Sequence, residues 1–141
     1  MAISFIGGFP ETSALEGTVT AGTAIAEGDL LEYSGNVLQR ATSSSTIHTL
    51  AGVALETIST TATEIKFAQI LPGQLFEVDV ANNTASTQRY ESMILTDHDT
   101  INNTDTTVTG PTGVFKAMTL TGAASDKKLI GTFQVSPQTS T

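Results

Sequence analysis

The 141-residue chain contains no cysteine and no tryptophan. Without thiols it can form neither a disulfide nor a thiolate metal site, and it has no cysteine nucleophile. Its aromatic side chains are limited to six phenylalanines and two tyrosines. This offers few rings on which a sugar could stack, so the sequence gives little support to a carbohydrate-binding module.

Charged side chains are also scarce. They make up 14% of the chain, against about 25% in an average globular protein, and the net charge is −8. A nucleic acid or an anionic membrane surface requires clustered positive charge. The basic residues are few and scattered, which excludes both partners: Arg40, Lys66, Arg89, Lys116, Lys127 and Lys128.

No apolar run approaches the roughly 18 residues of a membrane span. The N-terminal segment has no basic region and too short an apolar stretch for a signal peptide. We therefore expect synthesis in a host cytoplasm without a targeting signal.

Threonine is the most frequent residue, and serine, asparagine and glycine fill much of the remaining surface. Threonine is β-branched and suits a half-exposed strand. Apolar residues recur with a period of two, or in short runs between turn residues, and no long segment has a helical period. The pattern predicts one all-β domain, a small barrel or sandwich. The expected strands are 18–20, 30–33, 37–41, 50–58, 64–71, 74–80, 113–120 and 129–135, and 90–95 is expected to form a short strand or a helical turn.

Two pairs of these strands are expected to form hairpins, 30–33 with 37–41 and 64–71 with 74–80. Segment 50–58 is almost continuously apolar, which indicates a central strand covered on both faces. The predicted core residues are Leu30, Val53, Leu55, Phe67, Leu75, Val78, Phe115, Ile130 and Phe133.

Residues 1–16 are predicted to be an N-terminal arm, because Gly7, Gly8 and Pro10 interrupt regular structure. Its apolar side chains must pack either on their own domain or on a neighbouring molecule. The β domain then covers residues 17–135 with a loop-rich insertion at 81–112, and residues 136–141 form a polar tail. The candidate interface residues of the arm are Ile3, Phe5, Ile6, Phe9 and Pro10.

The cluster Asp97, His98 and Asp99 contains residue types that bind divalent metals. Adjacent residues of a strand point to opposite faces, so only a loop would bring them together. We interpret the cluster as a solvated loop, and we expect Asp29 and Glu32 to face solvent. No phosphate-binding loop or nucleophile motif is present. The sequence therefore predicts no enzyme, no metal site, no cofactor and no small-molecule substrate.

Several segments resemble the small head-decoration and capsid-cement proteins of tailed phages, which have a β-tulip-like fold. The similarity begins with Ala-Glu-Gly-Asp-Leu at 26–30, followed by the short hairpin at 33–38. It continues with Leu-Ala-Gly-Val-Ala at 50–54, Glu-Ile-Lys-Phe at 64–67 and Gln-Leu-Phe-Glu-Val at 74–78. Leu-Ile-Gly-Thr-Phe at 129–133 resembles the closing strand of related cement proteins. The similarity covers about half of the chain, and the segment 81–112 departs from the smallest members.

The resemblance implies a structural virion protein on the outer surface of a capsid, which bridges neighbouring major capsid subunits and stabilises the shell. It also implies self-association as a homotrimer. Two other interpretations remain open at this point. One is another virion part, such as a head-fibre base or a tail-associated protein, and the other is a carbohydrate- or protein-binding β module.

Overall fold

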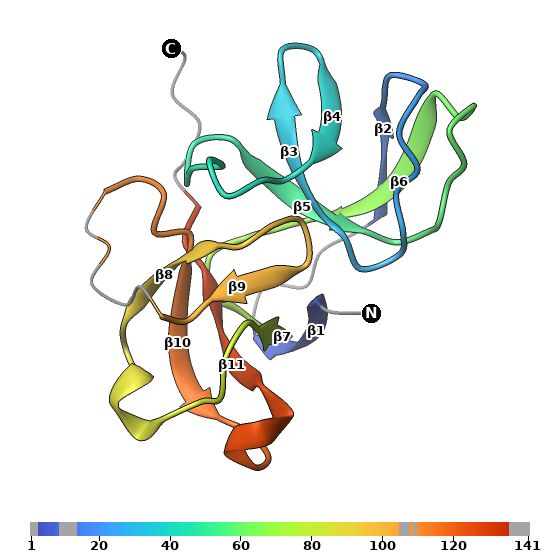
Figure 1. Cartoon of the computed structure of the whole chain (residues 1–141). Coiled ribbons are helices and arrows are strands. Elements are labelled where there is room, and N and C mark those ends of the chain that lie inside the picture. Colours follow the sequence, from blue (N-terminus) through green and yellow to red (C-terminus); the bar gives the residue numbers. More distant parts are fainter. Residues whose placement is uncertain (1–2, 9–13, 105–107, 109, 136–141) are drawn as a thin grey trace.

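The computed structural model describes residues 3–8, 14–104, 108 and 110–135. The fold is all-β, as the sequence predicts, and the described residues contain only two short 3₁₀ helices, η1 (Ser86–Gln88) and η2 (Ala124–Asp126). None of the described helices has the length and apolar character needed to cross a bilayer. The strands form two sheets that pack together (Figure 1).

The first sheet has six strands, and part of it closes into a small barrel. Strand β7 pairs with β11 along one edge, and at its C-terminal end it also pairs with β9. The order β7–β11–β10–β8–β9 therefore returns to β7, while β1 extends the sheet beside the first half of β7. We call this unit the first barrel. Its strands are β1 (Ile3–Gly8), β7 (Gln74–Val80), β8 (Ser92–Leu95), β9 (Thr100–Asn102), β10 (Phe115–Leu120) and β11 (Lys128–Phe133).

The second sheet has five strands in the order β2–β6–β5–β3–β4. Its two edge strands are joined by one isolated bridge, between Val19 and Leu38, so this sheet also curls into a barrel but closes incompletely. We call it the second barrel, and it occupies the upper part of Figure 1. Its strands are β2 (Ala14–Thr18), β3 (Leu30–Ser34), β4 (Val37–Arg40), β5 (Leu50–Ala54) and β6 (Glu64–Gln69).

Each barrel has its own apolar core. Three phenylalanines fill the first, where Phe133 contacts both Phe76 and Phe115 edge to face, with ring centroids 5.3 Å and 5.2 Å apart. Among the described residues, the second core contains one phenylalanine, Phe67. Consecutive residues of a strand point to opposite faces, so Leu30 belongs to the first core and its neighbour Leu31 to the second. Such strands join the barrels into one domain.

The alternation confirms the prediction that the segment beginning at residue 50 is covered on both faces, because all five residues of β5 are buried. The predicted hairpin between 30–33 and 37–41 is also confirmed as β3 and β4. It turns through Gly35, whose φ of 62° lies in the left-handed region that glycine adopts without steric cost. The second predicted hairpin is wrong, since β6 and β7 belong to different sheets.

Six of the nine predicted core residues are buried, namely Leu30, Val53, Phe67, Val78, Phe115 and Phe133. Leu55 was assigned wrongly: β5 ends at Ala54, and the leucine that follows is 42% exposed. Leu75 and Ile130 are half-buried. In their strands the alternation places the neighbouring positions inside instead, such as Phe76 and Leu129.

Two of the predicted domain boundaries do not match the structure. Residues 3–8 form a strand of the first sheet rather than an irregular arm. The segment 81–112 supplies β8 and β9, and Met93, Leu95 and Ile101 are buried in the first core. This segment is therefore an integral part of the first barrel and not a loop-rich insertion. The predicted tail, 136–141, lies outside the described residues.

Candidate functional site

The predicted interface at the N-terminus is only partly available to a partner. Ile3 is fully buried in the first core, whereas Ile6 is 49% exposed. The backbone of Phe5 pairs with Phe76, but the side chain of Phe5 and the whole of Phe9 and Pro10 lie outside the described residues. The sequence left open whether the apolar side chains of this segment pack on their own domain or on a neighbouring molecule. Ile3 packs on its own domain.

A cavity of about 350 Å³ opens at the end of the second barrel, between strands β2 and β4. Leu15 and Tyr33 stand at its rim and are 44% and 45% exposed. Leu38 and Phe67 also line it and are buried. The mouth of a β-barrel is a common place for ligand and partner binding. We call this site the barrel mouth, defined by Leu15, Gly17, Tyr33, Val37, Leu38 and Phe67.

A second exposed apolar site lies on the first barrel. Tyr90 is 63% exposed, and its backbone φ of 65° is unusual for a residue other than glycine. Its N–H donates a hydrogen bond of 2.6 Å to the carbonyl of Ala117, the residue before the exposed Met118. We call Tyr90 and Met118 the Tyr90 patch. Strained residues that persist in a folded protein cluster at functional sites.

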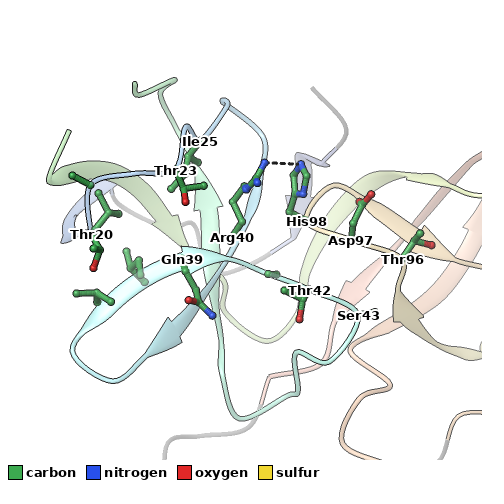
Figure 2. Close-up of a pocket in the computed structure, with 15 residues that line it drawn as sticks. Thr20, Thr23, Ile25, Gln39, Arg40, Thr42, Ser43, Thr96, Asp97 and His98 are labelled. Atoms are coloured by element: carbon green, nitrogen blue, oxygen red, sulfur yellow. Dashed lines mark hydrogen bonds between the residues drawn. The ribbon is translucent and has the colours of Figure 1, made fainter. Parts of the chain in front are cut away.

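A cleft of about 480 Å³, lined by both polar and apolar side chains, lies beside β4 (Figure 2). Hydroxyl and amide side chains line much of it, with Arg40, Asp97 and His98 at one end. The Nη1 of Arg40 lies 3.5 Å from the Nε2 of His98. Groups of this kind can hydrogen-bond a polar ligand or the polar rim of a protein partner.

The turn between β8 and β9 contains the cluster of acidic residues and histidine that the sequence singles out. Burial raises the pKa of the Asp99 carboxyl above its ordinary value, and the neighbouring Asp97 adds to this shift. Partial burial also acts to raise the pKa of Asp97, but hydrogen bonds from the side chain and N–H of Asp99 bring it below its ordinary value. The two carboxyls therefore influence each other, and their pKa values shift in opposite directions.

Two acidic residues that were expected to face solvent are buried, which corrects that expectation. Asp29 is 5% exposed and Glu32 is 8% exposed. The carboxylate of Glu32 accepts hydrogen bonds from Gln39, Ser45 and Thr49. Asp29 is covered by the β8–β9 turn of the first barrel, and Glu32, which lies within β3, by the segment that contains Ser45 and Thr49. Nothing local in the sequence shows either contact.

Neither the barrel mouth nor the Tyr90 patch was identified from the sequence. Leu15 lies within the predicted arm, and Tyr33 and Tyr90 were noted only as rings that a sugar could contact. The barrel mouth depends on the long-range placement of β2 against β4, which no local pattern encodes. No known family model and no curated protein matches the chain.

Proposed function

We propose that the protein is a structural virion protein that decorates a phage capsid and stabilises it by bridging neighbouring major capsid subunits. The observation that carries the proposal is the presence of two exposed apolar sites on different barrels. The barrel mouth exposes Leu15 and Tyr33 at the end of the second barrel, and the Tyr90 patch lies on the first. A protein that bridges two neighbours needs two such contact surfaces.

The chemistry of both sites suits protein partners. Tyrosine buries a large apolar area with little loss of side-chain entropy, and it is enriched at interface centres. Neutral polar residues such as Thr18 and Asn36 also line the barrel mouth, and they cost less to bury than charges. The low content of charged residues, 14%, supports the same interpretation.

The strain at Tyr90 is a further support. A left-handed backbone costs roughly 1 kcal/mol or more for a residue with a side chain, and an exposed aromatic ring gains nothing from its own core. Tyr90 combines both features. Contact with a partner would bury the ring, and this gain would offset the cost of the left-handed backbone.

The resemblance of the segments 26–30, 50–54, 64–67, 74–78 and 129–133 to capsid-cement proteins supplies the identity of the partner, the major capsid protein. It also supplies the proposed homotrimer and the location on the outer capsid surface. Repetition of weak contacts through a trimer would raise the overall affinity by avidity.

The proposal is tested by mixing the purified protein with expanded, undecorated capsids of its source phage. Copy number is measured after sedimentation, and shell stability by capsid melting. We expect saturation at hundreds of copies per capsid and a higher melting temperature of the shell. A handful of copies would support a fibre or tail part instead, and no binding would contradict the proposal.

Variants connect the result to the two sites. Tyr90→Ser and the double change Leu15→Ser with Tyr33→Ser should each weaken capsid binding by about tenfold or more, as at interface hot spots. The matched control is Leu55→Ser, because Leu55 is a comparably exposed leucine that belongs to neither site. Equal losses in all variants would point to a general effect on folding, and no loss in the site variants would overturn the role of these sites.

A sugar-binding module makes a different prediction. It would give glycan-array signals that Tyr33→Ser or Tyr90→Ser abolishes, while binding to capsids stays absent. The same variants therefore distinguish the two readings of the exposed tyrosines.

A further inference from the structure

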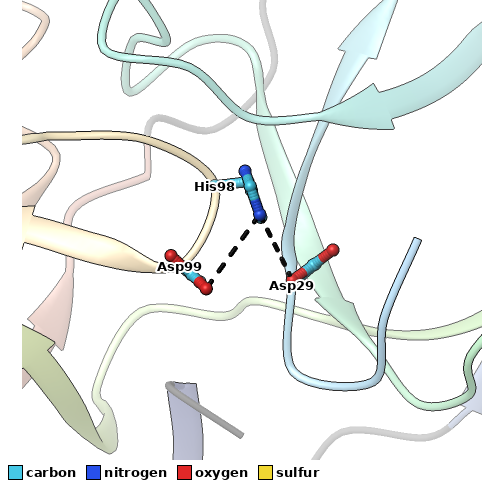
Figure 3. Close-up of side chains that lie close together, drawn as sticks. All are labelled: Asp29, His98 and Asp99. Atoms are coloured by element: carbon cyan, nitrogen blue, oxygen red, sulfur yellow. Dashed lines mark ion pairs between the residues drawn. The ribbon is translucent and has the colours of Figure 1, made fainter. Parts of the chain in front are cut away.

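Three potential metal ligands from distant parts of the chain meet where the two barrels touch. Asp29 precedes β3 of the second barrel, whereas His98 and Asp99 lie in the β8–β9 turn of the first. Figure 3 shows their side chains pointing toward one another. The Nε2 of His98 lies 3.8 Å from Asp29 Oδ1 and 4.0 Å from Asp99 Oδ2, and the three ligand atoms lie within 4.8 Å of one another.

Asp29 differs from His98 and Asp99 because its side chain is almost completely buried. Its side chain is only 7% exposed, and its Oδ2 accepts a hydrogen bond of 2.9 Å from the N–H of Ala26. Its Oδ1 has no hydrogen-bond donor among the described residues and points toward His98. Little solvent reaches this carboxylate, and a positive charge at Oδ1 would offset the cost of burying it.

The groups that meet at this point suit a cation. The carboxyls of Asp29 and Asp99 face the Nε2 of His98, and the guanidinium of Arg40 also approaches it. Two carboxylates and one imidazole nitrogen therefore face one point, a ligand set that a divalent cation can accept.

The backbone holds the two ligand-bearing loops together without help from the side chains. The N–H of Leu30 donates a hydrogen bond of 2.7 Å to the carbonyl of His98. This bond joins the residue after Asp29 directly to the residue before Asp99, and it fixes one barrel against the other. Ligands that are already placed lose less conformational entropy when an ion binds.

We propose that Asp29, His98 and Asp99 bind one divalent transition-metal ion that fastens the two barrels together. One imidazole and two carboxylates form a mixed nitrogen and oxygen set, which suits Zn²⁺, Co²⁺ or Mn²⁺ better than the all-oxygen preference of Ca²⁺. Water molecules complete the coordination of the ion. The site is independent of capsid binding, so either proposal can fail without the other.

The ligand atoms must move closer for this ion to bind. Metal bonds of about 2.0–2.2 Å place neighbouring ligand atoms roughly 3–3.5 Å apart, less than the 3.8 Å and 4.0 Å found here. His98 and Asp99 are partly exposed in their turn, so side-chain rotation can supply the change. Arg40 must also move away from the Nε2 of His98. The cleft beside β4, which Arg40 lines, gives the Arg40 side chain room to do so.

The test uses the full chain, stripped of metal with a chelator and titrated with Zn²⁺ in a calorimeter. We expect one Zn²⁺ per chain. At a free Zn²⁺ concentration about 100 times the Kd, Tm should rise by roughly 8 °C. Substitution with Co²⁺ should give a visible spectrum that reports coordination by nitrogen and oxygen ligands.

Matched variants place the ion. His98→Gln and Asp99→Asn should each weaken Zn²⁺ binding by about tenfold or more, with His48→Gln as the control, expected within about threefold of the unmodified protein. Arg40→Gln should tighten binding, because it removes a competing positive charge. Asp29→Asn is less suitable because this side chain is buried, whereas His98 and Asp99 are partly exposed and their variants are expected to fold.

Two results would overturn the proposal. The first is the absence of heat and of any Tm change with Zn²⁺, Co²⁺ or Mn²⁺ up to about 1 mM. The second is Zn²⁺ binding that survives His98→Gln or disappears in His48→Gln, which would place the ion elsewhere. One-to-one binding that only the His98 and Asp99 variants weaken supports the site.

Discussion

The two barrels of this chain have similar numbers of strands but are closed in different ways. In the first barrel, β7 pairs with β9 and completes a continuous circle of strands. In the second, one isolated bridge between Val19 and Leu38 joins the edge strands, and the barrel mouth stays open beside it. The closed barrel has a core of three packed phenylalanines. We infer that the first barrel contributes most of the stability and that the open end of the second is free to bind.

The largest expected effect compares one phenylalanine from each core. Phe133→Ala should lower the free energy of unfolding by about 4 kcal/mol, because it leaves a cavity between two other rings. Phe67→Ala should cost about 3 kcal/mol or less, since the barrel mouth lets water reach the vacated space. Chemical denaturation of both variants measures the difference. A larger loss for Phe67→Ala would contradict the division of roles between the barrels.

Glycine substitutions give the next largest effect. A Cβ at Gly131 would lie 2.2 Å from the backbone oxygen of Lys116 in the first barrel, and one at Gly17 would lie 2.3 Å from the Cδ1 of Leu38 in the second. A strand backbone cannot move aside as the end of a leucine side chain can. Gly131→Ala should therefore cost about 2–3 kcal/mol and Gly17→Ala about 1 kcal/mol or less.

The same denaturation experiment checks this pair. Equal costs would show that the Leu38 side chain beside Gly17 is held as firmly as the Lys116 backbone beside Gly131. A cost for Gly17→Ala that exceeds the cost for Gly131→Ala would reverse the comparison.

The smallest expected effect concerns the ion pair between Lys128 and Asp79 on the first barrel. The hydrogen bond with Asp79 raises the pKa of Lys128 above its ordinary 10.5, although partial burial opposes the shift. The pair therefore stabilises the fold fully below pH 10.5, and this contribution is lost as the pH rises through the raised pKa. Solvent screening keeps it below about 1 kcal/mol.

Comparison of variants isolates this pH dependence. Lys128→Met should remove part of the stability loss above pH 10.5, whereas Lys127→Met, which changes an exposed neighbour, should leave it unchanged. The same slope in the Lys128 variant and in the unmodified protein would show that the pair contributes nothing measurable.

Local patterns in the sequence predicted much of the secondary structure. The turn at Gly35 identified the β3–β4 hairpin, and the apolar run at 50–54 identified a strand buried on both faces. The core side of β7 and β11 was assigned less well, because apolar residues occur at both phases of their alternation. Leu75 and Ile130 were predicted to face the core, but their neighbours Phe76 and Leu129 face it instead.

The candidate sites depend on contacts between distant segments, which explains why the sequence did not reveal them. In the sequence, Asp29 looks like an ordinary turn residue. Its proximity to His98 follows only from the position of the β8–β9 turn in the fold. Glycines and a proline made residues 1–16 resemble an arm, but pairing with β7 turns residues 3–8 into a strand. In both cases a contact between distant segments overrides what the local sequence indicates.

The central claim is that the barrel mouth and the Tyr90 patch contact capsid subunits. Hydrogen exchange of the free and capsid-bound protein, followed by mass spectrometry, tests it most directly. We predict new protection at residues 14–18 and 33–38 and around Tyr90 and Met118, while the interior strands of the first barrel stay unchanged. Binding that protects neither site would contradict the claim.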